Sequence, residues 1–176
     1  MEQAFDLDSF IAKARRLGID TQRVEVKEAA QGLPKSIVDT ISAFANGSGG
    51  IIVCGLSEKH GFIPVDGFDP RRVSNALAQA CSDKMEPRIR ARIDVEDFEG
   101  ALVVVAHIPE LPPYMKPCYV KARPLYDGAF IRVGDGDRHL SRYEVDRLLE
   151  ERRQPHHDEA VVERATLADF DTKLKE

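Results

Sequence analysis

The sequence predicts an α+β domain in which a single mixed, partly antiparallel sheet packs with helices. Two observations carry the prediction. Residues 35–46 have a helical apolar stripe, and glycines then lead into the apolar run 51–55. Residues 88–95 alternate between apolar and polar side chains, and Gly100 separates them from a second apolar run at 102–108, which is typical of an antiparallel hairpin. Helices and strands thus mix along the chain, as in α+β domains.

The first half of the chain predicts three helices and two strands. Residues 7–17 form the first helix, because their apolar side chains recur at helical spacing and Gly18 follows. Residues 24–26 alternate and predict a short strand, and Pro34 suits the first turn of the helix 35–46. The run 51–55 does not alternate, so we expect it to be covered on both faces.

The third helix begins with Asp69 as its N-cap and Pro70 at its first position. After the hairpin, residues 118–120 and 129–133 predict two more short strands. Ser141 and Glu144 have the spacing of a capping box, which opens a helix that ends before Pro155. We therefore expect one domain over residues 1–153, with 154–176 as a linker and the start of a truncated C-terminal region.

Composition limits the class of protein. The chain has 176 residues, of which 43% are hydrophobic and 31% charged, which suits a globular domain with an adequate core. The net charge of -5 counts mildly against non-specific nucleic-acid binding, although a basic face would escape this test. The three cysteines have no C-x-x-C spacing, which fits a reducing cytoplasm. No apolar run reaches the length of a membrane span, so no membrane partner is expected.

The segment from Phe44 to Gly55 is the most informative part of the sequence. Its glycines close a helix and precede a strand, whereas a phosphate-cradling loop follows a strand and opens a helix. The order therefore argues against a nucleotide loop. We expect Gly47 to be a left-handed cap of the helix.

Four segments in order resemble the Schlafen/AlbA-like domain family. They are Glu25-Val26-Lys27-Glu28, the helix end and glycines at 41–50, the strand 51–56, and Ala129-Phe130-Ile131-Arg132-Val133-Gly134-Asp135. The likeness covers roughly residues 15–153. The resemblance implies an α+β fold related to nucleic-acid-binding AlbA domains. It also implies the N-terminal domain of a bacterial transcriptional regulator or of a protein related to ATP-dependent DNA helicases.

Some members of this family cleave RNA with three carboxylates and a divalent metal. The resemblance places the first two acids at Asp20 and Glu25, and the third at Ser57, where the aspartate is missing. Glu58 stands one position later, and a one-residue shift in a strand turns the side chain to the other face. Because ligand number governs such sites, we expect no metal cofactor here. Mg²⁺ or Mn²⁺ would be required only if the chain were a nuclease using Asp20, Glu25 and Glu58.

Arg88, Arg90 and Arg92 suggest a different function. Period-2 spacing places them on one strand face about 6.7 Å apart, so they could bind successive phosphates. A solvated face with salt bridges to Asp94 or Glu96 is the alternative, and the sequence leaves both open. Other basic residues that could contribute to a nucleic-acid site are Lys27, Lys84, Lys116, Lys121, Arg123, Arg132 and Arg138. His107 lies in an apolar strand, which predicts a core histidine.

Three functions follow from these patterns. The first is a module that binds nucleic acid, with DNA preferred over RNA, through its phosphate backbone. The second is a metal-dependent nuclease with a degraded carboxylate site, although we lean against an enzyme. The third is a protein-interaction domain, including a homo-oligomer, that uses a sheet edge or the region of Phe62 and Phe68.

Overall fold

The computed structural model describes residues 5–17 and 22–153. Within them the strands β1 (Val24–Lys27), β2 (Gly50–Cys54), β7 (Ala101–Ile108) and β6 (Arg92–Phe98) form a sheet in the order β1-β2-β7-β6. β1 runs parallel to β2, and the other two pairings are antiparallel. The mixed sheet and the hairpin β6–β7 confirm the predicted α+β class.

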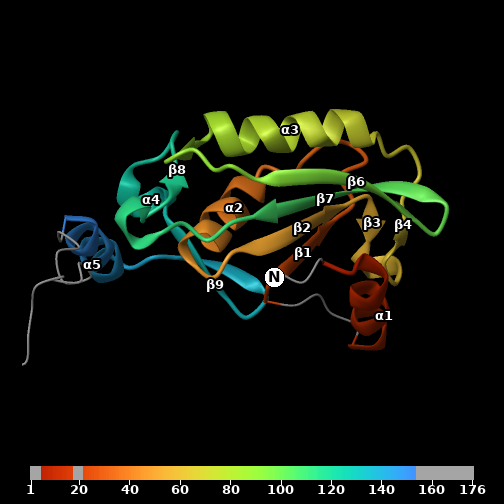
Figure 1. Ribbon diagram of the computed structural model, residues 1–176, viewed down its shortest axis with the longest axis horizontal. Coiled ribbons are helices and arrows are strands. Elements are labelled where there is room, and N and C mark those ends of the chain that lie inside the picture. Colours follow the sequence, from red (N-terminus) through yellow and green to blue (C-terminus); the bar gives the residue numbers. More distant parts are fainter. Residues whose placement is uncertain (1–4, 18–21, 154–176) are drawn as a thin grey trace, which may run out of the picture.

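The two faces of this sheet are covered by different helices. α2 (Ile37–Asn46) and α3 (Pro70–Asp83) pack on one face, and α1 (Leu7–Leu17) covers part of the other (Figure 1). Side chains of β2 alternate between two cores, with Ile52 and Cys54 in the first and Val53 in the second. The strand is therefore covered on both faces, as its unbroken apolar run predicts.

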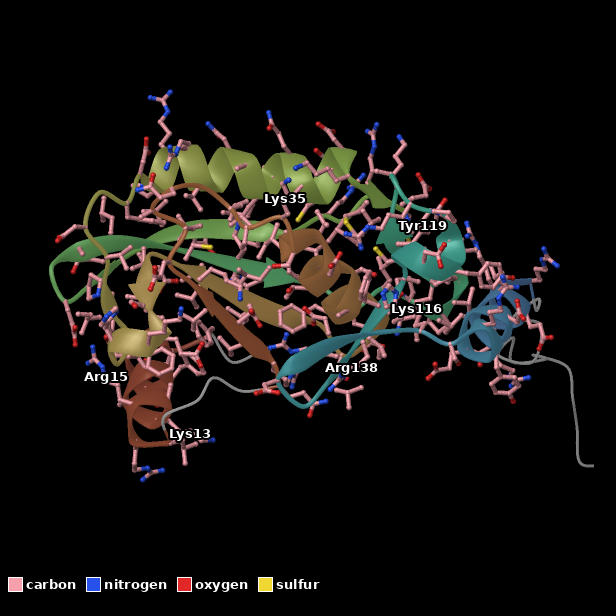
Figure 2. The ribbon with its side chains drawn as sticks, turned by 180° about the vertical axis from the view of Figure 1, so that it is seen from behind. Lys13, Arg15, Lys35, Lys116, Tyr119 and Arg138 are labelled. Carbon is pink, nitrogen blue, oxygen red and sulfur yellow. The ribbon has the colours of Figure 1, made fainter. Side chains whose placement is uncertain are left out.

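Helix α1 is held in place at the end of the sheet opposite the start of β6. Arg15 donates hydrogen bonds to the carbonyl oxygens of Gly61 (2.9 Å) and Phe62 (3.1 Å) and forms an ion pair with Glu99 in the β6–β7 turn (Figure 2). The bond to Glu99 raises the pKa of Arg15 above its ordinary value. Phe62 itself is buried, so the predicted docking surface around Phe62 is wrong for that residue.

Three two-stranded sheets accompany the central one, so the prediction of a single sheet was incomplete. They pair β3 (Leu56–Ser57) with β4 (Ile63–Pro64), β5 (Met85–Glu86) with β8 (Tyr119–Val120), and β9 (Phe130–Val133) with β10 (Gly136–His139). Short helical turns are η1 (Glu58–His60), η2 (Pro113–Met115) and α4 (Leu125–Gly128). The last described helix is α5 (Arg142–Arg153).

Both predicted helix starts are confirmed. The Asp69 carboxylate accepts a hydrogen bond from the backbone N–H of Arg72 (3.0 Å), and Pro70 opens α3. At α5, Glu144 accepts from the backbone N–H of Ser141 (2.7 Å), and Ser141 Oγ accepts from the N–H of Glu144 (3.2 Å). These bonds satisfy N–H groups that the first turn of a helix leaves unpaired.

The arginine strand begins later than its alternation predicts. β6 starts at Arg92, so Arg88 and Arg90 precede the strand. Its partner β7 ends at Ile108, and Pro109 has no N–H to continue the ladder. The N–H of Ile89 bonds instead to the carbonyl oxygen of Cys81 in α3 (3.0 Å). The ladder of three arginines on one strand is therefore wrong, although Arg88 and Arg90 remain exposed around buried Ile89.

The glycine turn also differs from its prediction. Gly47 has φ -87° and is not left-handed; Gly49, with φ +70°, makes the turn. The next residue, Gly50, lies against the ring of Phe44, since a Cβ there would be 2.6 Å from three ring carbons. The glycines thus serve the close approach of strand and helix. The predicted linker and truncated C-terminal region at 154–176 lie outside the described residues.

Candidate functional site

A cleft of about 900 Å³ opens at the end of the sheet where β1, β2 and β6 begin and β7 ends. One row of paired residues crosses the sheet here. Val24 pairs with Ile51, Ile51 with His107, and His107 with Arg92. Directly paired residues point to the same face, so this row gives the cleft a continuous floor. Its remaining lining is Phe5, Arg23, Ser48, Gly49, Gly50, Arg90, Ile108, Pro109 and Glu110.

Three arginines from two separate segments meet at this cleft. Arg23 lies just before β1, Arg90 just before β6, and Arg92 begins β6. All three are exposed. Arg23 Nη2 donates to the carbonyl oxygen of Ser48 (3.1 Å), whereas Arg90 has no hydrogen bond or ion pair with any described residue. Two of the predicted arginines thus line the cleft, and Arg23 is a lining residue that sequence reasoning missed.

Arg92 is held in a fixed orientation. Its Nε donates to Asp94 Oδ2 (3.0 Å), and its Nη2 lies 2.9 Å from His107 Nε2. Arginine can only donate, so His107 Nε2 accepts and carries no proton. His107 is half-buried at the cleft floor. The prediction that His107 is a core residue is therefore wrong. Its strand pairs it with Arg92, on the face of the sheet that α1 covers only in part.

The other predicted basic residues do not join the cleft lining. Arg88 is exposed and has no bonded partner among the described residues. Lys121 is exposed, and its N–H bonds to the carbonyl oxygen of Lys84 (2.8 Å), so these two lysines are neighbours. Arg138 is exposed on β10 (Figure 2).

Lys116 and Arg123 have internal partners. Lys116 Nζ donates to Glu110 Oε1 (2.8 Å) and to the carbonyl oxygen of Gly47 (3.3 Å), and its side chain is 10% exposed. Glu110 lines the cleft, so Lys116 lies beside the cleft and neutralises this acidic lining residue. Arg123 pairs with Asp39 (2.8 Å) and lies over the ring of Phe130.

Glu25 lies in a buried network of charges. Its carboxylate pairs with Lys27 and, at 2.6 Å, with Arg132 Nη2. Arg132 Nη1 also donates to Asp137 (3.0 Å), whose second oxygen accepts from Thr40 Oγ1 (2.7 Å). The network joins β1, α2, β9 and β10 on the face opposite the cleft floor.

Arg132 is accordingly a poor candidate for a phosphate ligand. Its side chain is 5% exposed, and its guanidinium lies over the ring of Phe44. Burial acts to lower the pKa of Arg132, but its hydrogen bonds to Asp137 and Glu25 and their charges outweigh burial and raise it. Lys27 is likewise committed to Glu25. Arg132 and Lys27, both predicted to contact nucleic acid, instead form ion pairs within the domain.

The predicted carboxylates do not form a cluster in the described part of the chain. Asp20 lies outside it, Glu25 is paired as above, and Glu58 is exposed in η1. Within residues 5–17 and 22–153 no group of three histidine, cysteine or acidic side chains is arranged to hold a metal ion.

Ser57, at the position of the missing aspartate, is buried. Its Oγ donates to Glu28 Oε1 (2.6 Å) and lies 2.8 Å from His60 Nδ1. The hydroxyl has one proton, which goes to Glu28, so His60 Nδ1 donates to Ser57. His60 therefore does not accept the Ser57 proton, as a base that activated this hydroxyl would have to. The three side chains instead tie η1 to the end of β1.

Comparisons with known proteins identify the family. The family described as Schlafen, AlbA_2 matches residues 20–141, more than half of the chain. The fold and this match together define the chain as an α+β domain of nucleic-acid-related type. The chain belongs to the Schlafen AlbA_2 family. No protein with a curated description matches it.

Solved structures agree with this assignment. The N-terminal domain of a RecG-related protein from Nitrosomonas europaea, named for an ATP-dependent DNA helicase, is 26% identical, with a TM-score of 0.57. The match covers 85% of this chain and 94% of that one. The DIP2311 protein from Corynebacterium diphtheriae shares the fold at 20% identity and a TM-score of 0.52, over 83% of this chain and 28% of its own. Among the described helices, none is long and apolar enough to cross a membrane.

Proposed function

We propose that this chain is a nucleic-acid-binding module that contacts the phosphate backbone through the cleft at the end of its sheet. The observation that carries the proposal is the convergence of Arg23, Arg90 and Arg92, from two segments far apart in the sequence, on one concave surface. Guanidinium groups match phosphate geometry and stay charged at any physiological pH. The local excess of positive charge opposes the net charge of -5 of the whole chain.

The states of Arg90 and Arg92 support this role. Arg92 is oriented by Asp94 and His107, so little side-chain entropy remains to be lost on binding. Arg90 has no competing partner among the described residues and can turn toward a ligand. Glu110 would repel phosphate, but Lys116 neutralises it.

The surroundings of Glu25 favour binding over cleavage. A carboxylate that serves as a metal ligand must offer free oxygen lone pairs, and both oxygens of Glu25 already accept from cations. Ser57 replaces the third acid and is itself engaged by Glu28 and His60.

We further propose that the natural ligand is DNA and that the module serves a transcriptional regulator. The family assignment and the RecG-related neighbour, whose name refers to a DNA helicase, support this choice. In this proposal the arginines contact the phosphate backbone rather than base edges, so recognition of a particular base sequence would require other parts of the regulator.

Fluorescence anisotropy tests the proposal. Labelled duplex DNA, single-stranded DNA and hairpin RNA are titrated with the protein at two salt concentrations. Binding is expected to weaken steeply with salt, because neutralised phosphates release counterions. Arg23→Ala and Arg90→Ala should each weaken binding several-fold and lower the salt slope by about one.

Arg71→Ala is the matched control. Arg71 is an exposed arginine in the first turn of α3, on the face of the sheet away from the cleft floor, so its replacement removes the same charge elsewhere. The proposal fails if Arg71→Ala weakens binding as much as Arg90→Ala does, or if no nucleic acid binds at low salt. In the second case a protein-interaction role becomes the better hypothesis.

A further inference from the structure

The cleft has a lining that phosphate contacts alone do not use. Between the arginines its floor is apolar and aromatic, with Val24, Ile51 and the ring of His107 in one row. Phe5 stands beside this row, with its ring centroid 6.1 Å from that of His107 and the two planes at 83°. The cleft therefore contains an aromatic corner as well as positive charge.

The order of these side chains across the sheet is informative. The row runs from Val24 in β1, the edge strand beside Arg23, to Arg92 in β6, the other edge strand. Three inter-strand steps of about 4.8 Å place the two ends about 14 Å apart. Cationic groups thus flank the apolar floor on both sides. This span is about twice the spacing of successive phosphates, so it suits a segment of two nucleotides, whose flat, weakly polar bases lie between its outer phosphates.

From this arrangement we infer that the cleft binds single-stranded nucleic acid, with one unpaired base against Phe5, Ile51 and His107 and the two outer phosphates of a two-nucleotide segment at Arg23 and Arg92. In a duplex the bases are stacked inside and cannot reach the floor. An unstacked base can lie against an aromatic ring, and such contacts tolerate any base. The inference rests on the proposed function and specifies the form of nucleic acid.

The aromatic corner is also sufficiently fixed to serve as a platform. Phe5 packs against Phe10 of α1 at 5.7 Å between ring centroids, and Phe10 does not line the cleft. His107 is held by Arg92. Phe5 is half-buried, so part of its ring remains accessible.

The experiment compares three probes of equal length: a labelled oligothymidine, the same strand with abasic sites, and its duplex with oligoadenine. The single strand should bind at least ten-fold more tightly than the duplex. Abasic sites should remove most of this advantage. Phe5→Ala should weaken binding of the intact strand about ten-fold and leave binding of the abasic strand unchanged, because only the base contacts the ring.

Two further variants keep the test independent of folding. Phe5→Leu retains the packing on α1 but not the aromatic ring and should lose nearly as much affinity as Phe5→Ala. Tyr143→Leu removes an exposed aromatic ring from α5, outside the lining of the cleft, and should bind like the natural chain. A strand containing 2-aminopurine should lose fluorescence on binding when its base stacks, and this loss should be smaller with Phe5→Leu.

The outcomes separate the two proposals. Equal affinity for intact and abasic strands, or for single strand and duplex, overturns the single-strand inference. If that binding still depends on Arg90 and on salt, the proposed function stands. If no probe binds at low salt, both are overturned.

Discussion

Arg132 Nη2 lies 2.6 Å from Glu25 Oε2, and this contact joins two residues 107 positions apart. It connects the edge strand β1 with β9, outside the central sheet. Both residues come from segments that carry the family resemblance. In this chain the two residues therefore hold the β9–β10 hairpin against the central sheet.

Glu25→Gln is expected to destabilise the fold by about 3 kcal/mol, because a buried guanidinium loses one of its two charged partners. Urea unfolding would measure the loss. The double variant Glu25→Leu with Arg132→Met should be less destabilised than the sum of its two single variants, since it leaves neither charge unpaired. Glu150→Gln, which removes one end of the exposed pair with Arg147, should change stability little. A loss for Glu25→Gln as small as for Glu150→Gln would contradict the assignment.

Asn46, at the end of α2, is a second point of cohesion. Its Nδ2 donates to the carbonyl oxygens of Cys118 (2.8 Å) and Phe130 (2.9 Å), and its Oδ1 accepts from the N–H of Cys118 (2.6 Å). Asn46→Asp keeps the shape but replaces two donors by an acceptor that faces two carbonyl oxygens. We expect a loss of at least about 2 kcal/mol in thermal or urea unfolding.

The exposed Asn75 of α3 supplies the control for this prediction. Asn75→Asp is the same chemical change without buried partners, and it should leave the unfolding midpoint nearly unchanged. Similar losses at both positions would mean that the buried bonds of Asn46 contribute little.

Gly50→Ala tests the close contact between β2 and α2. The added Cβ would lie 2.6 Å from the ring carbons of Phe44, so the strand or the ring must move, at a cost of about 1–3 kcal/mol. Gly136→Ala is the comparison, because a Cβ there has no neighbour closer than 3.9 Å and its φ is not positive. Differential scanning calorimetry should show a clear fall in Tm for the first variant only. Equal values of Tm for the two variants would contradict the explanation that Gly50 is required by its contact with Phe44.

All three cysteines should be unreactive in the folded chain. Burial raises the pKa of Cys54, Cys81 and Cys118 to about 12, so the thiolate that attacks a disulfide reagent is scarce at pH 8. A colorimetric disulfide reagent should titrate none of them in the native protein and three in denaturant. Rapid reaction of a thiol without denaturant would show that the core opens.

The same thiols predict a pH dependence of stability. Their folded pKa lies above the unfolded value of about 8.5, so the neutral thiol favours the folded state. Their contribution is complete below that value and is lost as the pH rises from about 8.5 toward 12. The urea midpoint should therefore fall across this range, and less steeply when Cys81 is replaced by alanine.

Local patterns sufficed for part of the structure. The N-cap Asp69, the capping box of Ser141 and Glu144 and the alternation around the hairpin turn concern neighbours within a few positions, and all were predictable. The start of β6 was not, because it depends on Pro109, which follows the partner strand β7, and on a bond from Ile89 to α3. The functions of Arg132 and Lys27 were also hidden, since their partners are set by packing between distant segments.

The sequence by itself determined the class of fold, the family and the positions of most helices, because periodicity, caps and glycine turns act over short distances. Only the tertiary structure decided which charges meet. It placed Arg23, Arg90, Arg92 and His107 around one cleft and enclosed Glu25 with Arg132. Strand register brings residues together across the sheet regardless of their separation in sequence, and no local pattern contains that information.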